Sequence, residues 1–209
     1  MFFLLLATIT VPLGSPDGWH HLSFGGLTPN TVHYGAEGIR IEVRRSSSPL
    51  FRPFPSTLAV RRLSASGRAT GVPSLSDGAE GDGRNDDYTL RVGLAVEGRD
   101  SLGFFQRLFA PSWLKRLIEL APDPRIDRVS FLCLAQRREP GSRRRHPRSR
   151  YVEEDVAARV TGPGPFAIDH RFEPALRSLG LWVHADGDDT RSEFDVAIQS
   201  IGIETDETP

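Results

Sequence analysis

The sequence contains one cysteine, Cys133, and one lysine, Lys115, among its 209 residues. A single cysteine excludes an intrachain disulfide and a thiolate metal cluster. Cys133 lies inside the apolar stretch 129–135, with no basic neighbour in the sequence that would lower its pKa, so we expect a buried and unreactive thiol. Arginine supplies nearly all of the positive charge, a skew that indicates genome composition rather than recognition chemistry.

The sequence also lacks the motifs of several large functional classes. It has no glycine-rich phosphate loop, nucleophile elbow or dinucleotide fingerprint, and its histidines show no zinc-binding spacing. The arginine-rich stretch 137–150 contains Pro140, Gly141 and Pro147 and no interleaved aromatic residues. We therefore expect this stretch to be a solvated loop, and we expect no nucleic-acid partner.

The composition is that of one folded, turn-rich domain, with 38% hydrophobic residues, 20 glycines and 16 prolines. The net charge of -1 hides a segregation of charge along the chain. Residues 61–150 carry about 18 basic and about 11 acidic side chains, whereas residues 151–209 carry about 4 and about 13. We expect these two segments to fold together and neutralise each other.

The amino-terminal residues 2–13 form an apolar run that is followed by a turn-forming Gly-Ser-Pro-Asp sequence. This run has the length of a secretory signal peptide and is too short to span a bilayer, although no basic residue precedes it. We predict a signal peptide over residues 1–15, a single domain over 16–205 and a tail over 206–209. The mature protein would be periplasmic or secreted, without a transmembrane span. The alternative is that residues 4–11 form the first strand of the domain.

Alternating apolar residues predict β-strands with one buried face. The clearest strand covers residues 88–96, and shorter ones cover 39–43 and 179–183. The stretch 129–135 is apolar on both faces, as in a central strand that is covered on each side. In the last strand the apolar positions change parity between Ile198 and Ile201, which predicts a β-bulge near Gln199 and Ser200.

Only one segment has helical periodicity, and we expect one short helical insert around residues 103–120. The predicted fold class is therefore all-β: a two-layer antiparallel β-sandwich, jelly-roll or galactose-binding-like, with that insert. The residues expected in its core are Leu90, Val92, Leu94, Phe131, Leu181, Val183, Val196 and Ile198.

Three stretches of the chain resemble the bacterial family known as domain of unknown function 3047. Residues 85–92 contain Asp-Asp-Tyr followed by an arginine, as in the family. Residues 150–155, Arg-Tyr-Val-Glu-Glu-Asp, resemble the family's Arg-x-Val-x-Glu-Asp pattern, and residues 186–190 resemble its Asp-x-Asp-x-Thr pattern. The sequence departs from the family at Val156, where an aromatic residue is usual. The resemblance implies an exported bacterial protein with a jelly-roll-like sandwich, similar in outline to carbohydrate-binding modules and without an assigned activity.

Carboxylates gather where the predicted strands begin and end, and loops at the ends of sandwich strands commonly carry function. Trp182 alternates with apolar residues and is the best candidate for an exposed aromatic platform that stacks on a sugar. The alternative is that Trp182 belongs to a second core. The candidate ligand-binding residues are Trp182, Asp86, Asp87, Tyr88, Arg91, Glu154 and Asp155.

Asp186, Asp188 and Thr190 form a short series of hard oxygen ligands that suits a structural Ca²⁺ ion. The full EF-hand pattern is absent, and the alternative is a turn that side-chain hydrogen bonds stabilise. We expect five carboxylates to meet at one end of the sandwich, because antiparallel neighbours place one strand's start beside the other's end. Either Arg91 or a cation would then compensate their charge. The five are Asp86, Asp87, Asp155, Asp186 and Asp188.

These patterns favour an exported, non-catalytic β-sandwich that binds a carbohydrate or an envelope polymer. Two alternatives stay open: a glycan-active enzyme that uses the clustered carboxylates, and a structural envelope protein without a small ligand. No cofactor is expected beyond the Ca²⁺ ion, and the sequence does not predict an oligomeric state.

Overall fold

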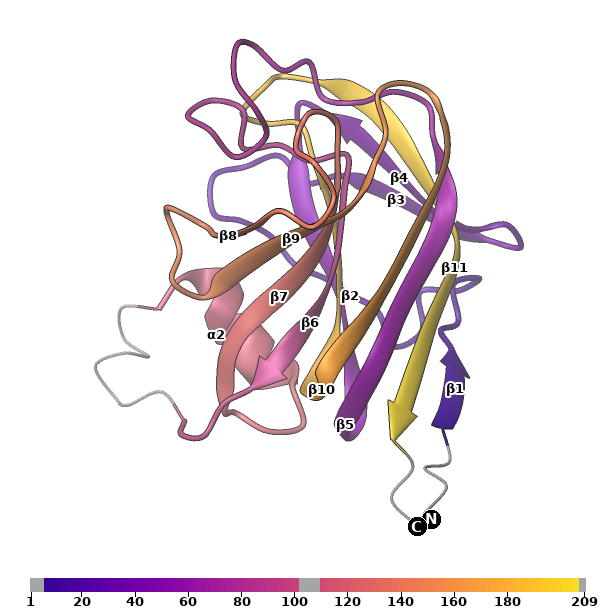
Figure 1. Cartoon of the computed structure of the whole chain (residues 1–209), viewed down its shortest axis with the longest axis vertical. Coiled ribbons are helices and arrows are strands. Elements are labelled where there is room, and N and C mark those ends of the chain that lie inside the picture. The colour runs from indigo at the N-terminus through magenta and orange to yellow at the C-terminus, as the bar shows by residue number, and fades with distance from the viewer. Residues whose placement is uncertain (1–5, 102–109, 207–209) are drawn as a thin grey trace.

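A computed structural model describes residues 6–101 and 110–206, and these residues are mostly β-strand with one helix (Figure 1). The predicted β-rich class with one short helix is confirmed. Part of the predicted insert, residues 103–109, lies outside the described residues. The elements are β1 (Leu6–Thr10), β2 (His20–His21), β3 (Thr31–Gly35), β4 (Gly38–Arg44), β5 (Ser47–Ala69), β6 (Leu90–Glu97), α2 (Ser112–Leu120), β7 (Ile126–Ala135), β8 (Arg143–Arg145), β9 (Val152–Arg159), β10 (Gly164–Asp186) and β11 (Glu193–Asp206).

The strands form one hydrogen-bonded sheet in the order β3-β4-β11-β5-β10-β6-β7-β9-β8, with β1 added to β11 and β2 to β5. Neighbouring strands are antiparallel except for β7 and β9, which are parallel. The sheet is thus mostly antiparallel, as predicted, with this one parallel pair as the exception. Parallel neighbours need a crossover connection, and here residues 136–151 make it, with the edge strand β8 inside the crossover.

Two layers arise because the 23-residue strands β5 and β10 belong to both halves of the sheet. They pair with each other along most of their length. The second half of β5 also pairs with β11, and the second half of β10 pairs with β6. Irregular register in β10 between Arg171 and Leu176 marks the change from one half to the other, and Figure 1 shows the two long strands side by side.

The first hydrophobic core lies between these halves. It joins Ile41 of β4 and Ile203 of β11 to Leu132 of β7 and Leu181 of β10. All eight residues expected in the core are buried, and seven of them belong to this first core, whereas Phe131 faces the second core described below. The bulge predicted in the last strand is also confirmed, since the register of β11 against β5 shifts between Ile198 and Ser200.

A second core lies on the outer face of β6, β7 and β10, where α2 covers the sheet with Leu114 and Leu117. The sequence predicted that β6 has one exposed face, but seven of its eight residues are buried. Strand β7 is covered on both faces, as expected, and Cys133 is buried as a free thiol. Burial raises the pKa of Cys133 well above its usual value.

The amino-terminal segment is part of the domain in this structure. Strand β1 pairs with β11 over five residues, from Leu6 opposite Asp206 to Thr10 opposite Gly202. Val11 and Leu13 are buried in the first core. The signal peptide and the boundary after residue 15 stay predictions, although the structure places residues 6–10 of that segment in a strand. Likewise Asp206, predicted in the tail, is the last residue of β11.

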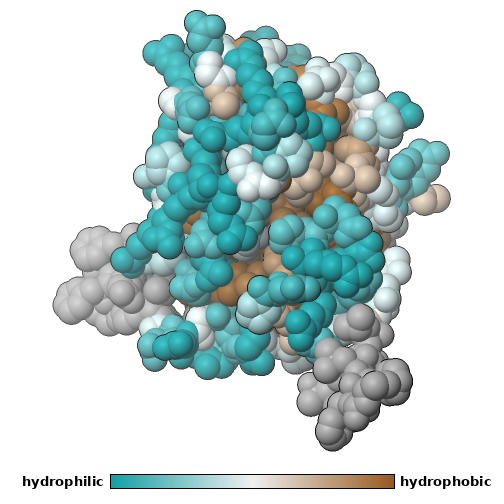
Figure 2. All heavy atoms as spheres, in the orientation of Figure 1, coloured by the Kyte–Doolittle hydropathy of each residue, from teal (hydrophilic) through white to brown (hydrophobic). Residues whose placement is uncertain are grey.

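Hydrophilic side chains dominate the face shown in Figure 2, and hydrophobic residues form a band across its middle. Among the residues with described side chains, the large apolar ones that are exposed are Ile9 and Leu27. Within residues 6–101 and 110–206, no helix is long and apolar enough to cross a membrane.

Candidate ligand-binding site

The carboxyl end of β10 and the start of β6 bring the predicted acidic residues together. The two strands are antiparallel neighbours, with His184 opposite Arg91, so residues 86–88 lie beside residues 186–190. A pocket of about 290 Å³ opens here, and α2, β7 and β9 contribute further lining residues.

Arg91 is the central cation of this site. Its side chain is 4% exposed, and its Nε donates to Glu154 Oε1 at 3.2 Å. The two terminal nitrogens donate to Asp186 Oδ2 and, at 2.7 Å, to the carbonyl of Asp86. The guanidinium also lies over the Tyr88 ring, 4.5 Å from its centroid. Burial alone would lower the pKa of Arg91, but Asp186 and Glu154 outweigh burial and raise it, so Arg91 is charged.

A second set of basic groups surrounds Asp86 and Glu154. Arg144 donates from Nε to Glu154 Oε2 at 2.5 Å and from Nη2 to Asp86 Oδ1 at 3.1 Å. His146 donates from Nε2 to Asp86 Oδ2 at 2.8 Å. Burial alone would raise the pKa of Asp86, but the hydrogen bond from His146 and the charge of Arg91 lower it to about 2.

Both basic residues come from the stretch that the sequence assigned to a solvated loop, and that prediction is wrong for Arg144 and His146. Strand β8 pairs with β9 so that Arg144 lies opposite Glu154. On either side, Arg143 pairs with Asp155 at 2.5 Å and Arg145 with Glu153 at 3.5 Å. Here the basic and acidic segments neutralise each other, as their segregated charges predicted.

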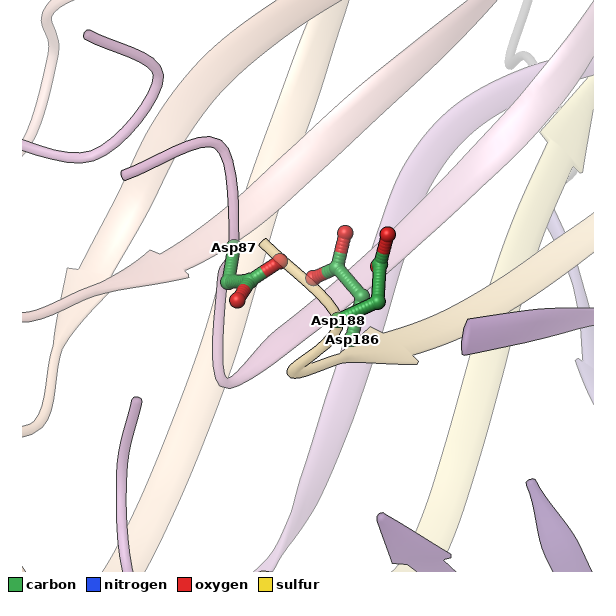
Figure 3. A group of neighbouring side chains, drawn as sticks. All are labelled: Asp87, Asp186 and Asp188. Atoms are coloured by element: carbon green, nitrogen blue, oxygen red, sulfur yellow. The ribbon is translucent and has the colours of Figure 1, made fainter. Parts of the chain in front are cut away.

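Asp87, Asp186 and Asp188 form a group of carboxylates whose oxygens lie within 4.8 Å of one another. Figure 3 shows Asp87 reaching from the segment before β6 toward the two aspartates at the end of β10. Asp186 accepts a hydrogen bond from the Tyr88 backbone nitrogen at 2.8 Å in addition to Arg91. These three residues could hold a cation through oxygen ligands.

Thr190, which the sequence placed among the metal ligands, contacts Asp87 instead. Its hydroxyl and its backbone nitrogen donate to Asp87 Oδ2 at 2.5 and 2.7 Å. Asp189 donates its backbone nitrogen to Asp87 at 3.3 Å. Asp87 thus stabilises the turn after β10, which is the side-chain-bonded turn given as the alternative to a metal site.

Asp188 is the least compensated carboxylate of the group. In the described residues it makes no ion pair within 4.0 Å, whereas Asp189 has Arg148 at 3.6 Å. Burial and the charges of Asp87 and Asp189 raise the pKa of Asp188 to about 6. His184 shares a hydrogen bond of 2.8 Å with Ser47, and burial lowers its pKa well below the usual value, so its imidazole is neutral.

Aromatic residues also line the pocket, namely Phe24, Trp113, Phe131 and Trp182. Trp182 lies edge-on to Trp113, with centroids 5.5 Å apart, and to Phe131, with centroids 6.0 Å apart. It is only 2% exposed and belongs to the second core, so it is not an exposed platform. Its Nε1 nevertheless has no hydrogen-bond partner among the described residues. Trp113, on α2, is half-buried.

Most of the predicted ligand-binding residues meet at this site. Asp86, Arg91, Glu154 and Trp182 line the pocket, as do Asp186 and Asp188 from the predicted metal set, while Asp87 and Tyr88 contact this group. Asp155 does not join them, because it lies on the other face of β9 from Glu154 and pairs with Arg143.

Sequence reasoning missed several lining residues of the pocket, and four of them show why. Three are polar, and contacts between distant segments, which no local sequence pattern reveals, bring them to the pocket. The fourth is on α2. Helical spacing assigned this fourth residue to core packing, and no sequence signal placed α2 beside β10. The four are His146, Arg148, Asp189 and Trp113.

The fold and this site define a β-sandwich protein with an acidic, aromatic-walled pocket at one end of its central strands. No protein-family model matches the chain, and no curated protein matches its sequence; the resemblance to domain of unknown function 3047 stays a prediction. Among solved structures, the chain is similar to a xylan-binding module, CBM15, with a TM-score of 0.41 and 10% identity over 97% of this chain and 99% of that one. At this level the similarity concerns overall shape and bears on neither ligand nor site.

Proposed function

We propose that this protein binds a glycan in the pocket between β10 and α2. The observation that carries the proposal is the composition of the pocket walls. The aromatic rings of Trp113 and Phe24 and a group of carboxylates line the same pocket. Sugar rings present apolar C–H faces and hydroxyl groups, so this combination suits them: rings contact the faces while carboxylates accept hydrogen bonds from the hydroxyls.

The test is a glycan array probed with the wild-type protein and with Trp113→Ala. We choose Trp113 because it is half-buried, whereas Trp182 is in the core and its truncation would damage the fold. Tyr34→Ala is the matched control, since Tyr34 is a half-buried aromatic residue on β3 that does not line the pocket.

We expect Trp113→Ala to lose most glycan binding, by about tenfold or more, while Tyr34→Ala retains it; removing an aromatic contact at the centre of a site costs about 2 kcal/mol. Circular dichroism of both variants establishes that they are folded. Equal binding by wild type and Trp113→Ala would place the ligand elsewhere. An array without any bound glycan would favour the alternative of a structural envelope protein.

A second candidate function is hydrolysis of a glycan. The observation that favours it is that two carboxylates in one pocket differ widely in acidity, with a pKa of about 2 for Asp86 and about 6 for Asp188, which is the pattern of a base and an acid. Release of reducing ends from polysaccharides separates this candidate from binding alone. Asp188→Asn should abolish release and leave binding measurable if Asp188 is the acid.

We also propose that the protein is exported, on the basis of the apolar run at residues 2–13. A fusion of residues 1–30 to a reporter that is active only in the periplasm tests this proposal. An active reporter supports export. A reporter that stays inactive, even after the fusion is extended to an upstream start codon, would indicate that the apolar run belongs to the folded domain and is not a signal peptide.

A further inference from the structure

The pocket carries an excess of negative charge. Five of the side chains that line it are carboxylates, namely Asp86, Glu154, Asp186, Asp188 and Asp189, whereas two are arginines, Arg91 and Arg148. Two histidines, His146 and His184, also line the pocket, and the imidazole of His184 is neutral. In a partly enclosed pocket such an excess acts over short distances with little screening by water.

Most of this charge is already compensated by the protein. Arg91 pairs with Asp186 and Glu154, and Arg144 pairs with Asp86 and Glu154. Asp86 also accepts a hydrogen bond from His146. Arg148 lies 3.6 Å from Asp189 but is 60% exposed, so water weakens this pair. In the described part of the chain Asp188 makes no ion pair, and its carboxylate lines the pocket. A positive charge is therefore missing beside Asp188.

The aromatic residues that line the pocket supply a second feature that suits a cation. The faces of tryptophan and phenylalanine rings carry negative partial charge and attract ammonium groups. Trp113 is half-buried and lines the pocket with Phe24 and Phe131. Trp182 is 2% exposed and lines the same pocket, and its Nε1 has no hydrogen-bond partner among the described residues. This donor needs an acceptor oxygen, such as a sugar hydroxyl or ring oxygen.

We propose that the sugar unit held in this pocket carries a protonated primary amine, which pairs with the Asp188 carboxylate near the aromatic residues of the pocket. The proposal rests on the proposed glycan-binding function and names its ligand class. The volume of about 290 Å³ lies at the small end of ligand pockets, so one sugar ring fills it. An anionic sugar would instead meet the carboxylate excess and be repelled.

The experiment compares two oligosaccharides of equal length, one of β-1,4-linked glucosamine and one of its N-acetylated form, by isothermal titration calorimetry. Acetylation removes the positive charge and leaves the ring. At neutral pH and low salt we expect the amine form to bind at least about tenfold more tightly than the acetylated form. We also expect its affinity, unlike that of a neutral ligand, to fall as salt is raised.

Asp188→Asn is the informative variant, because it removes the charge, keeps the shape and breaks no ion pair. It should weaken binding of the amine form by about tenfold and weaken that of neutral sugars much less. Asp82→Asn is the matched control: Asp82 is 56% exposed, pairs with Arg138 at 2.7 Å and does not line the pocket. This control should bind both oligosaccharides as the wild type does.

The possible results separate the two proposals. Binding of neutral glycans with no preference for the amine would overturn this inference and leave the glycan function standing. Binding of a lysine-rich peptide, without binding of either sugar, would overturn the glycan function and show that the acidic pocket accepts amines of another kind. Preferential binding of the amine oligosaccharide that Asp188→Asn does not change would also contradict the proposal, since the charge would then act elsewhere.

Discussion

At the scale of single residues, Arg91 is the group on which the buried charges of the site depend. It contacts Asp186 and Glu154, whose side chains are 8% and 1% exposed. Breaking a buried ion pair leaves an uncompensated charge in the interior. The site is therefore held in shape by electrostatics as much as by packing, and mutations in it will affect stability as well as binding.

We predict that Arg91→Met lowers the free energy of unfolding by about 3–5 kcal/mol at neutral pH, the usual cost of stranding buried partners. Urea denaturation of the purified protein measures this change. Arg148→Met is the control, because Arg148 is 60% exposed and surface pairs contribute about 1 kcal/mol or less. A loss below about 1 kcal/mol in Arg91→Met would mean that a cation or water already compensates Asp186 and Glu154.

Asp188 gives a prediction for the pH dependence of stability. Burial, then Asp87 and Asp189, raise its pKa from 3.8 to about 6. Between these two values the folded protein holds a proton that the unfolded chain has lost, so this group lowers stability as pH rises through that window. Asp188→Asn should therefore be more stable than the wild type at pH 7 and equally stable near pH 3.

Because Asp188 is partly exposed, solvent screening limits this gain to about 1 kcal/mol or less. Thermal unfolding without ligand at several pH values measures the difference between the two proteins. A difference that stays the same at every pH would show that Asp188 titrates normally in the folded protein.

At the scale of elements, the strands were predictable where a local pattern determines which face is buried. The alternation in β6 and the parity change in β11 both follow from side chains that must face the first core. The position of Glu154 relative to Asp155 was not predictable in this way. Adjacent residues of a strand point to opposite faces, and only the pairing of β9 with β7 and β8 decides which one faces Arg91.

Burial of the second face of β6 and β10 could not be predicted from the sequence either. It depends on where α2 packs, and nothing in the helix specifies which strands it covers. Trp182 is an example. Its alternation with apolar residues predicted an exposed side chain, but α2 covers it through Trp113. Charge segregation was a better guide, because β8 and β9 are opposite in charge and form an ion-paired ladder.

Gly180 marks a point where β10 tolerates no side chain. The register of β10 shifts between Ser178 and Gly180, and a Cβ atom at Gly180 would lie 2.4 Å from the Phe51 ring and 2.8 Å from the Arg52 carbonyl. We predict that Gly180→Ala destabilises the fold by about 1–3 kcal/mol through overpacking, measured by urea denaturation. Gly164→Ala, in the same strand but without atoms within 4 Å of the new Cβ, should be nearly neutral. Equal stability of both variants would contradict this account.

The amino-terminal segment gives a matched pair of substitutions that tests whether it is in the domain. Val11 is 5% exposed and Ile9, in the neighbouring strand β1, is 38% exposed. If the segment packs as described, Val11→Asp buries a charge and should cost more than about 3 kcal/mol, whereas Ile9→Asp should cost far less. The two melting temperatures measure this difference. Indistinguishable variants, or a purified protein whose mass lacks residues 1–15, would support the cleaved signal peptide.

At the scale of the whole molecule, the pocket and the fold are built from the same parts. The strands that carry Arg91, Glu154 and Asp186 also form the wall between the two cores. Ligand binding therefore couples to global stability, since any ligand that binds only the folded state raises the melting temperature in proportion to the logarithm of its concentration.

The shared strands β5 and β10 also determine how cooperatively the protein unfolds. Because each strand runs through both halves of the sheet, neither half keeps a complete set of backbone partners once the other is lost. We predict one cooperative transition by circular dichroism and tryptophan fluorescence, with the slowest hydrogen exchange at amides where β5 and β10 pair and the same opening free energy in both halves. Exchange at two distinct rates, one for each half, would contradict this expectation. The two halves of the sandwich would then unfold as separate cooperative units, rather than as one unit joined by β5 and β10.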